Sequence, residues 1–360
     1  MLPFLGEEFG NPSSSHAFGT RARAAVEHAR EQVAQLLGCA PGEIVFTGGG
    51  SEANNLALKG IADTLAGQGN HIITSVIEHP AIINPCRHLE RKGYRVAYLP
   101  VDSTGLVAPE AVRAAITDAT ILISVMHANN EVGTIQPIEE IGRIARGRGI
   151  AFHTDAAQSV GKIRTRVGDL GVDLLTVAGH KLYAPKGVGA LFVRRGVTLE
   201  PLIHGAAHEH GLRAGTENVA GIVGLGQACE IAARDLVETA QRVQALRNAF
   251  HRTLEEKAGR VVLNGHVERR LPNTLNLSFE GSDSDALLHA LPEIAASTGA
   301  ACHAHSREAS AVLTAMGVPA ALALSAVRFS LGRGNTAQEM ERAAELIVAA
   351  VANARGGLAR

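Results

Sequence analysis

Residues 43–60 read EIVFTGGGSEANNLALKG, with a short apolar run, three consecutive glycines and then a longer stretch of mixed character. The apolar run is typical of a buried strand, and the residues from about Ser51 onward are typical of a helix. Glycines allow the tight turn that joins the two. The stretch therefore predicts a strand, a turn and a helix in succession, which is the repeating unit of α/β folds.

The same alternation continues on both sides of this unit. A helical stripe over residues 21–37, closed by Gly38, comes before it. After it come the apolar runs HIITSVIE, RVAYLP, TILISVMHA, AFHTDAA and DLLTVAG, with helical patterns near Pro80, in PEAVRAAI and in IEEIGRIARG. This order predicts a mainly parallel sheet with helices on both faces. In such a sheet, binding sites form at the carboxyl ends of the strands.

The pattern changes past about residue 236. A long helix rich in Gln, Arg and Glu is followed by the expected strands VVLNG, TLNLSF and RFSLG and by a last helix over about residues 336–354. We therefore predict a large domain, residues 1–235, and a smaller α+β domain, residues 236–360, with the boundary inside a helix.

The composition is that of a folded chain with little net charge. Of its 360 residues, 46% are hydrophobic and 19% are charged, and the formal net charge is −1. This much apolar surface supports a large core, and the balanced charge does not favour binding to a polyanion. The chain also has no tryptophan on which bases could stack, so we expect no nucleic-acid partner.

Neither targeting segments nor cysteine spacing suggests an extracellular or metal-binding protein. The segment MLPFLGEEFGNPSSS lacks the pattern of a secretory signal, and no run of about 18 apolar residues occurs. We therefore expect a cytoplasmic protein with no membrane partner. The four cysteines, Cys39, Cys86, Cys229 and Cys302, are scattered without C-x-x-C spacing, which argues against a disulfide framework and a zinc ribbon.

Three strand ends carry chemistry. The helix that starts near Ser51 presents backbone N–H groups to an anion, Asp155 ends the strand AFHTD, and Lys181 follows the strand DLLTVAG. Alone, each has a plainer interpretation: a simple glycine turn, a helix cap and a solvated lysine. Together they suit pyridoxal phosphate, which needs a phosphate site, a carboxylate at its ring nitrogen and an amine for a Schiff base.

Longer motifs make the interpretation specific. The segments GHKLYAPKGVGALF, FHTDAAQSVGK, HANNEVGTIQP, RAGTENVAGIVGLG and TGAACHAHSREASAVLTAMG, followed by VRFSLGRGNT, closely resemble the cysteine desulfurases. These are pyridoxal-phosphate enzymes of the class V aminotransferase group with the transferase fold of type I. The resemblance runs from residue 9 to the C-terminus and implies a homodimer of the bacterial iron–sulfur or nitrogen-fixation type.

The resemblance assigns a role to each residue around the cofactor ring. It implies that Lys181 is the Schiff-base lysine and catalytic base, that Asp155 pairs with the ring nitrogen, and that Gln158 contacts the ring hydroxyl. His79 corresponds to the histidine that stacks over the ring and shuttles protons.

The resemblance also assigns the phosphate site. Gly50, Ser51 and His180 match positions that hold the phosphate, and Thr216 matches one that reaches the phosphate of the partner subunit. Ala178 stands where many relatives carry a phosphate-binding serine, so we expect one hydrogen bond fewer in this protein.

The substrate and the sulfur-accepting group follow in the same way. Asn130 and Arg328 match residues that fix the substrate carboxylate, a task that suits the fork of arginine, and Asn130 also lies beside the cofactor in the family. Cys302 matches the nucleophile that receives sulfur as a persulfide. The implied reaction converts L-cysteine to L-alanine, with a sulfur-acceptor or scaffold protein as partner.

Several alternatives stay open from the sequence. The segment Gly-Ala-Ala-Cys-His at residues 299–303 also resembles selenocysteine lyase, and another class V lyase or an epimerase would not need Cys302. Only eight residues precede FGNPSSS, where relatives have a longer segment that lines the site, so a non-catalytic scaffold for a sulfur acceptor is a further alternative. His204, His208 and His210, with His303 and His305, could be metal ligands, but histidines beside Cys302 better suit tuning of its thiolate.

Overall fold

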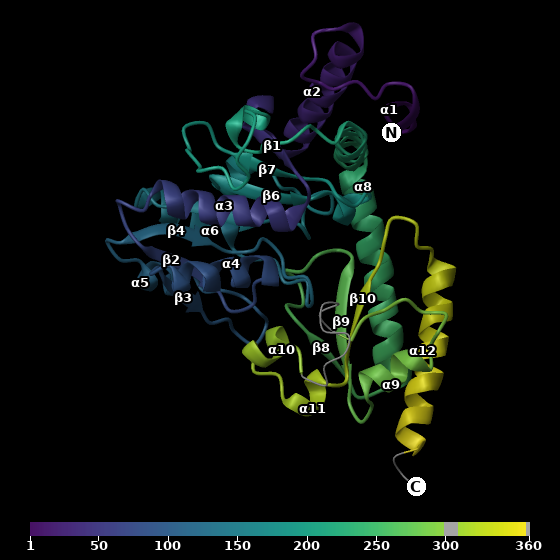
Figure 1. Ribbon diagram of the computed structural model, residues 1–360. Helices are drawn as coiled ribbons and strands as arrows, with labels where there is room; N and C mark the ends of the chain where they lie inside the picture. The colour runs from purple at the N-terminus through teal and green to yellow at the C-terminus, as the bar shows by residue number, and fades with distance from the viewer. Residues whose placement is uncertain (299–308, 358–360) are drawn as a thin grey trace. The chain divides into compact units, whose positions relative to one another are not determined.

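The computed structural model describes residues 1–298 and 309–357 (Figure 1). It contains two compact units: the first comprises Met1–Leu99, Ala108–His127 and Pro137–Leu236, and the second comprises Pro100–Val107, Ala128–Gln136 and Val237–Arg360. The helix α8 (Val219–Ala258) contributes residues to both. The two domains predicted as residues 1–235 and 236–360 stay a prediction, and the units differ from them by the two short segments.

These two segments group with the later residues through backbone hydrogen bonds. The Ile135 N–H donates to the Arg269 carbonyl at 2.8 Å, and the Leu271 N–H donates to the Gly133 carbonyl at 2.9 Å. Such contacts join parts of the chain that are more than a hundred residues apart. Hydrogen bonds of this kind produce no periodic pattern in the sequence and could not be predicted from it.

The first unit contains a seven-stranded sheet in the order β1-β7-β6-β5-β4-β2-β3. β7 runs antiparallel to β1 and β6 and the other pairs of strands are parallel, so the predicted mainly parallel sheet is confirmed. The strands are β1 (Ile44–Thr47), β2 (His71–Ser75), β3 (Arg95–Leu99), β4 (Thr120–Ser124), β5 (Ala151–Asp155), β6 (Leu174–Ala178) and β7 (Gly189–Val193).

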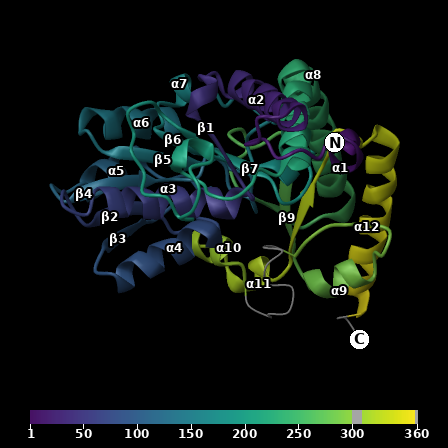
Figure 2. The same cartoon turned by 45° about the horizontal axis from the view of Figure 1, so that its top comes forward.

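Helices connect these strands in two groups, visible in Figures 1 and 2. The connecting helices are α3 (Gly50–Thr64), α4 (Pro80–Arg91), α5 (Pro109–Ala115), α6 (Ile138–Gly147) and α7 (Val167–Leu170), and α1 (Leu2–Gly6) and α2 (Ala17–Leu37) precede β1. α3 packs on α4, whereas α5 packs on α6 and α6 on α7. The chain moves one way from β1 through β2 to β3 and the other way from β3 to β6, so right-handed crossovers put the two groups on opposite faces.

The central strands β4, β5 and β6 are buried almost throughout, as expected for a sheet covered on both faces. His153 in β5 is fully buried between the hydroxyls of Ser124 on β4, at 2.9 Å, and Thr176 on β6, at 3.1 Å. Burial lowers the pKa of His153 to about 3, so this histidine is a neutral part of the core.

The second unit is an α+β arrangement with a three-stranded antiparallel sheet in the order β10-β9-β8. Its elements, besides the second half of α8, are β8 (Val261–Asn264), β9 (Thr274–Phe279), α9 (Ser284–His289), α10 (Ala311–Ala315), α11 (Ala320–Ala323), β10 (Ala326–Ser330) and α12 (Ala337–Gly357). Phe329 packs edge-on against both Phe250 and Phe279 at the centre of its core. None of the helices in residues 1–298 and 309–357 has the length and apolarity that a membrane crossing requires.

Candidate active site

Asp155 stands at the carboxyl end of β5 and is 6% exposed. Its Oδ2 accepts a hydrogen bond from Nδ2 of Asn54 on α3 at 2.7 Å, and its Oδ1 accepts one from the Ala157 N–H at 2.9 Å. Two donors on two different elements hold the carboxylate in one orientation. A fixed carboxylate at a strand end is suited to bind a protonated ring nitrogen.

His79 is the residue immediately before helix α4, and its Nδ1 accepts the Ala81 N–H at 3.0 Å. The hydrogen of the neutral ring therefore lies on Nε2. Burial lowers the pKa of His79; the charge of Asp155 opposes this shift, and the charge of Lys181 adds to it. The charges of Asp155 and Lys181 thus both act on His79, so the three residues lie in one region of the first unit.

Glu78 lies beside His79 and is buried. Its Oε1 accepts the Ser75 hydroxyl at 2.7 Å and the Met126 N–H at 2.9 Å, which joins the end of β2 to the residues after β4. Its Oε2 is buried and, among the residues that the structure describes, has no hydrogen-bond partner. Burial raises the pKa of Glu78 to about 8, and the nearby Asp155 adds to the shift, so the carboxyl is mostly protonated at neutral pH.

Lys181 follows β6 in the short 3₁₀ helix η2 (Gly179–Leu182). His180 precedes it, and burial lowers the pKa of this histidine, with the charges of Lys181, Lys186 and Lys162 adding to the shift. The region after β6 is therefore rich in positive charge. Cations gathered at one strand end attract an anionic ligand.

The glycine turn between β1 and α3 forms the other part of this region. Gly49, with φ of 148°, precedes the helix and has no side chain to cap it, so the first N–H groups of α3 remain for an anion. A Cβ on Gly189 of β7 would lie 2.8 Å from backbone atoms of Gly49, and one on Gly50 would lie 3.1 Å from the Ala178 Cβ. The turn is thus packed tightly against the ends of β6 and β7, and this cradle fits a phosphate group.

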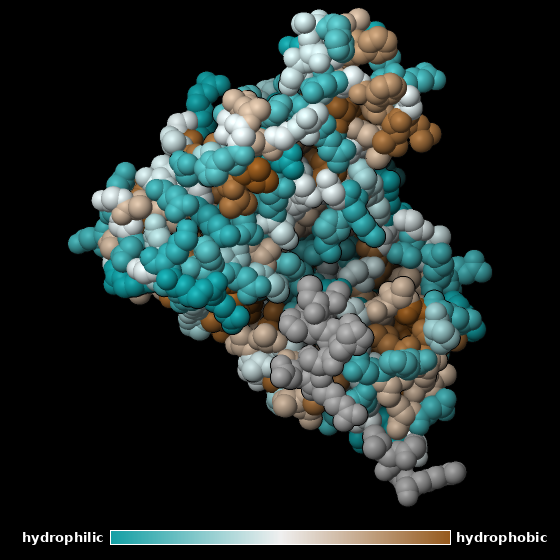
Figure 3. All heavy atoms as spheres, in the orientation of Figure 1, coloured by the Kyte–Doolittle hydropathy of each residue, from teal (hydrophilic) through white to brown (hydrophobic). Residues whose placement is uncertain are grey.

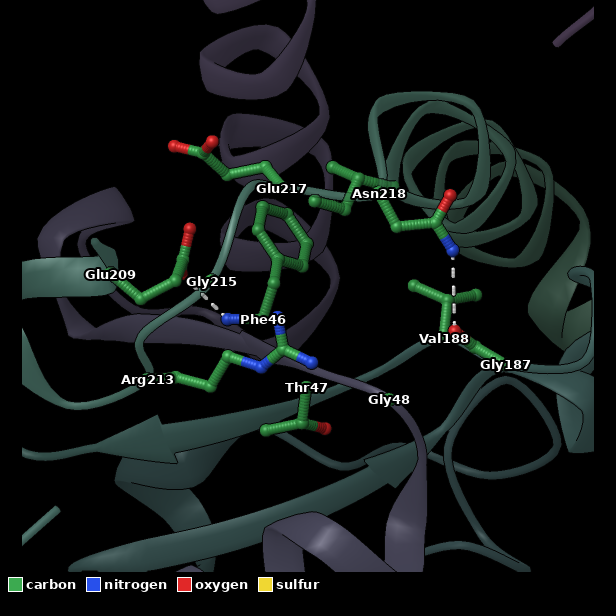
Figure 4. Close-up of a pocket in the computed structure, with 11 residues that line it drawn as sticks. Phe46, Thr47, Gly48, Gly187, Val188, Glu209, Arg213, Gly215, Glu217 and Asn218 are labelled. Atoms are coloured by element: carbon green, nitrogen blue, oxygen red, sulfur yellow. Dashed lines mark hydrogen bonds between the residues drawn. The ribbon is translucent and has the colours of Figure 1, made fainter. Parts of the chain in front are cut away.

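Thr216 lies in an exposed loop that is tied to the same helix. Arg213 Nε donates to Glu52 Oε1 at 3.0 Å, and Glu52 Oε2 accepts the Gly48 N–H at 2.8 Å. Figure 4 shows the small pocket between the loop and the glycine turn, with Gly215 and Glu217, the neighbours of Thr216, among its lining residues. The loop that carries Thr216 therefore has a fixed anchor at the start of α3.

A buried ion pair holds the earlier part of this loop. Arg30 on α2 donates to both carboxylate oxygens of Glu209 at 2.8 Å, and Glu209 Oε2 also accepts the Phe46 N–H at 2.7 Å. Both side chains are almost fully buried, and the Arg30 guanidinium carbon also lies 4.7 Å from the centroid of the Phe46 ring. The pair joins α2, β1 and the short 3₁₀ helix η3 (Glu209–Gly211).

The two residues expected to bind the substrate carboxylate lie in the second unit. Arg328 is on β10, and its Nη1 donates to the carbonyl of Asn130 at 3.0 Å. The preceding Asn129 accepts the N–H groups of Glu131 and Val132 with its side chain, at 2.8 and 3.0 Å, which shapes the turn. Asn130 and Arg328, although 198 residues apart, are therefore neighbours.

Cys302, His303 and His305 lie outside the described residues. Of the remaining cysteines, Cys86 and Cys229 are buried and Cys39 is half-buried, and burial raises the pKa of each to about 12. Their thiols are therefore poor nucleophiles at neutral pH, as is typical of cysteines that serve packing. Within the described part of the chain, no three His, Cys, Asp or Glu residues come together as a possible metal site.

Three residues that support the site were not singled out from the sequence. Asn54 orients Asp155, Glu78 joins two strand ends, and Glu52 anchors the loop of Thr216. One signal was present: Asn54 stands at helical spacing from the apolar residues Ala57, Leu58 and Ile61, and a buried polar side chain there requires a partner. The partner itself lies 101 residues away and has no sequence signal.

Comparison with known proteins agrees with this geometry. The family model described as "Aminotransferase class-V" matches residues 1–343. A cysteine desulfurase IscS of Dictyoglomus turgidum is 49% identical over 342 residues, which cover 94% of this chain and 87% of the relative. The chain belongs to the aminotransferase class-V family. A cysteine desulfurase IscS of Methanosarcina thermophila, 48% identical over 96% of this chain and 86% of its own, is a further relative.

Solved structures of this family have the same fold. A NifS-like protein superposes with a TM-score of 0.91 at 38% identity, over 98% of this chain and 94% of the other. A structure titled SspA in complex with cysteine superposes with a TM-score of 0.82 at 40% identity, over 93% and 94%. The class-V transferase fold expected from the motifs is thereby confirmed.

Proposed function

We propose that the protein is a pyridoxal-phosphate-dependent cysteine desulfurase, which converts L-cysteine to L-alanine and leaves the sulfur as a persulfide on Cys302. The observation that carries this proposal is the grouping of Asp155, His79 and Lys181 near the N-terminus of α3. The names of the relatives, cysteine desulfurase IscS, support the same reaction. The persulfide sulfur would go to an acceptor or scaffold protein for iron–sulfur clusters or other sulfur-containing products.

The residues of the first unit fit pyridoxal phosphate. Gly50, Ser51 and His180 would hold its phosphate, because α3 presents its first N–H groups there and the region after β6 is cationic. Asp155 would bind the ring nitrogen and Gln158 the ring hydroxyl. When bound, pyridoxal phosphate supplies a sink for the negative charge that develops at Cα of the amino acid.

The side chains around the ring divide the proton movements between them. Asp155, held by Asn54 and Ala157, keeps a proton at the ring nitrogen. Lys181 removes the proton from Cα. Its amine lies within electrostatic range of His79, the histidine assigned to stack on the ring. His79, neutral with its hydrogen on Nε2, would donate a proton from that atom.

Substrate binding and sulfur transfer complete the reaction. Asn130 and Arg328 would bind the α-carboxylate, for which a guanidinium fork is well suited. The Cys302 thiolate then forms a bond to the substrate sulfur while the bond between that sulfur and Cβ breaks. The electron pair of the broken bond stays with the carbon skeleton, which takes up protons and leaves as alanine.

Mass spectrometry tests the proposal directly. After incubation of the holoprotein with L-cysteine, we expect the peptide that contains Cys302 to gain one sulfur atom and alanine to appear in equal amount. Lys181→Ala should give neither product, and Cys302→Ala should lose cysteine turnover at least about 100-fold. A Cys302→Ala variant with near wild-type turnover would instead support a lyase, and faster turnover of selenocysteine than of cysteine would favour selenocysteine lyase.

Asp155→Asn provides a test of the ring assignment. We expect this variant to bind the cofactor but to lose most of its turnover, because a neutral amide does not hold a proton at the ring nitrogen. Unchanged turnover would mean that another group faces that nitrogen. Absorbance of the bound cofactor, measured alongside turnover, separates loss of binding from loss of chemistry.

A further inference from the structure

Lys162 is a half-buried cation for which the proposed mechanism has no role. It ends the motif AAQSVGK, and its ammonium Nζ donates to the backbone carbonyl of Gln158 at 2.8 Å and to Gln158 Oε1 at 3.4 Å. Both acceptors belong to the residue assigned to the ring hydroxyl. Both of these hydrogen bonds therefore link Lys162 to the site through Gln158.

The described residues around Lys162 bring positive charge to it and no counter-ion. Among the described residues, no carboxylate lies within ion-pair distance of its Nζ, whereas Lys181 and His180 are in electrostatic contact with it. Burial lowers the pKa of Lys162 to about 7, with Lys181 adding to the shift. An amine kept in such a place is costly unless an anion balances it, and bound pyridoxal phosphate would bring one.

The contact with Gln158 has a directional consequence. An ammonium has only hydrogens to offer, so it selects the oxygen of the Gln158 amide and leaves the Nε2 hydrogens for another acceptor. Without this contact the Gln158 side-chain amide could flip by about 180° and direct Oε1, instead of Nε2, toward the ring. An amide oxygen facing the ring hydroxyl oxygen in its ionised form would be repulsive.

We propose that Lys162 is a positioning residue of the cofactor site, which fixes the Gln158 amide so that Nε2 donates to the ring oxygen of pyridoxal phosphate and which favours the ionised form of that oxygen. The inference rests on the proposed function, since it requires that pyridoxal phosphate bind at Lys181. The charged groups near the proposed contact are Lys181 and His180 after β6, Asp155 at the end of β5 and His79 before α4.

Two measurements on the full-length protein test the proposal. One is the dissociation constant of pyridoxal phosphate from the reconstituted protein, and the other is the pH midpoint of the absorbance change of the bound cofactor. In Lys162→Met we expect about tenfold weaker binding, as for loss of one charged hydrogen bond. We also expect the midpoint to rise by about one pH unit, because a nearby positive charge no longer favours the ionised oxygen.

A double-mutant cycle identifies the route of the effect. If Lys162 acts through Gln158, the change Lys162→Met should weaken binding less than about twofold when made in a Gln158→Ala background. Lys162→Arg, which keeps the charge and the donors, should restore the midpoint towards that of the wild type. Lys92→Met, at an exposed lysine after α4, is the matched control and should leave both quantities unchanged.

Every outcome bears on one of the two proposals. An unchanged midpoint in Lys162→Met, or losses that simply multiply in the cycle, would refute the role of Lys162 while leaving the proposed function in place. A wild-type protein that forms no adduct between Lys181 and pyridoxal phosphate would refute the proposed function and this role together. Should Lys162→Met fail to fold, Lys162→Gln removes the charge but keeps a polar side chain, and the same midpoint is measured.

Discussion

Individual buried polar side chains set the chemistry of the site. Asp155 would be an ordinary strand-end acid without Asn54, which lies on a different element and orients it at 2.7 Å. Glu78 shows the opposite case, because one of its oxygens is buried without a partner among the described residues. Such a carboxyl is stable in the folded protein chiefly in its neutral form.

We predict that Glu78→Gln changes the pH dependence of stability. The pKa of Glu78 is raised to about 8 in the folded protein, so between about pH 4.5 and pH 8 the folded state binds more protons than the unfolded state. Ionisation of Glu78 therefore makes the wild type less stable as the pH rises through this window. Glu78→Gln cannot ionise, and its free energy of unfolding should gain about 1–3 kcal/mol on the wild type between pH 5.5 and pH 8.

Urea denaturation at these two pH values measures the effect. Glu110→Gln, at an exposed glutamate on α5, is the control and should follow the wild type at both pH values. Equal pH dependence of Glu78→Gln and the wild type would show that Glu78 is already ionised in the folded protein at pH 5.5.

At the scale of elements, the site is built where strands end and helices begin. The turn before α3 is shaped by a neighbour that is distant in sequence, because β7 brings Gly189 against the backbone of Gly49. A strand that contributes no catalytic side chain thereby sets the position of the proposed phosphate site. The absence of a side chain at Gly189 allows the backbone of β7 to pack directly against Gly49.

We predict that Gly189→Ala weakens binding of pyridoxal phosphate and lowers stability. The added Cβ would lie 2.6 Å from the Val177 carbonyl oxygen and 2.8 Å from Gly49, and neither backbone can move easily. Overpacking of this kind costs about 1–3 kcal/mol of unfolding free energy. Gly168→Ala, on α7 with open space around the new Cβ, is the control and should leave cofactor affinity and stability nearly unchanged.

The elements themselves were largely predictable from the sequence. Each expected strand and helix has a counterpart in the structure, because each was an apolar run or a periodic stripe bounded by Gly or Pro. β7 was not predicted, since GALFV follows directly on the glycine-rich segment APKGVG. The contacts of Asn54, Glu78 and Lys162 were not predictable, because a hydrogen bond between distant residues leaves no periodic signal.

At the scale of the whole molecule, part of the apolar surface is left uncovered. Leu2, Leu5, Phe9 and Phe18 are 81%, 66%, 76% and 55% exposed, and they lie in α1, at the start of α2 and between the two. Figure 3 shows brown side chains gathered at the N-terminal end of the chain. We call these four residues the N-terminal apolar patch; such patches commonly mark an association surface.

We predict that the protein is a homodimer and that the N-terminal apolar patch contributes to its stability. Thr216, assigned to the phosphate of the partner subunit, lies in the exposed loop and would need a second copy to act. Replacing Leu5 and Phe9 with serine should raise the dissociation constant of the dimer in sedimentation equilibrium at least about tenfold. Val237→Ser, another exposed apolar position, is the control.

A wild-type protein that sediments as a fully active monomer would contradict this prediction. An unchanged dissociation constant in the Leu5 and Phe9 variant would place the association surface elsewhere. Measuring turnover at the same protein concentrations links association to activity, since Thr216 would lose its target on dissociation.

The two short segments of the second unit affect how the protein is made. Residues 100–107 and 128–136 leave the ribosome more than a hundred residues before Arg269, Leu271 and Asn276, to which the later segment is hydrogen-bonded. During synthesis the later segment lacks these hydrogen-bond partners until residues 269–276 have been made, whereas the strands on either side of it can already pair. A fragment that starts at Val237 would lack residues 100–107 and 128–136. Splitting the gene at that point should therefore give two fragments that depend on each other for folding.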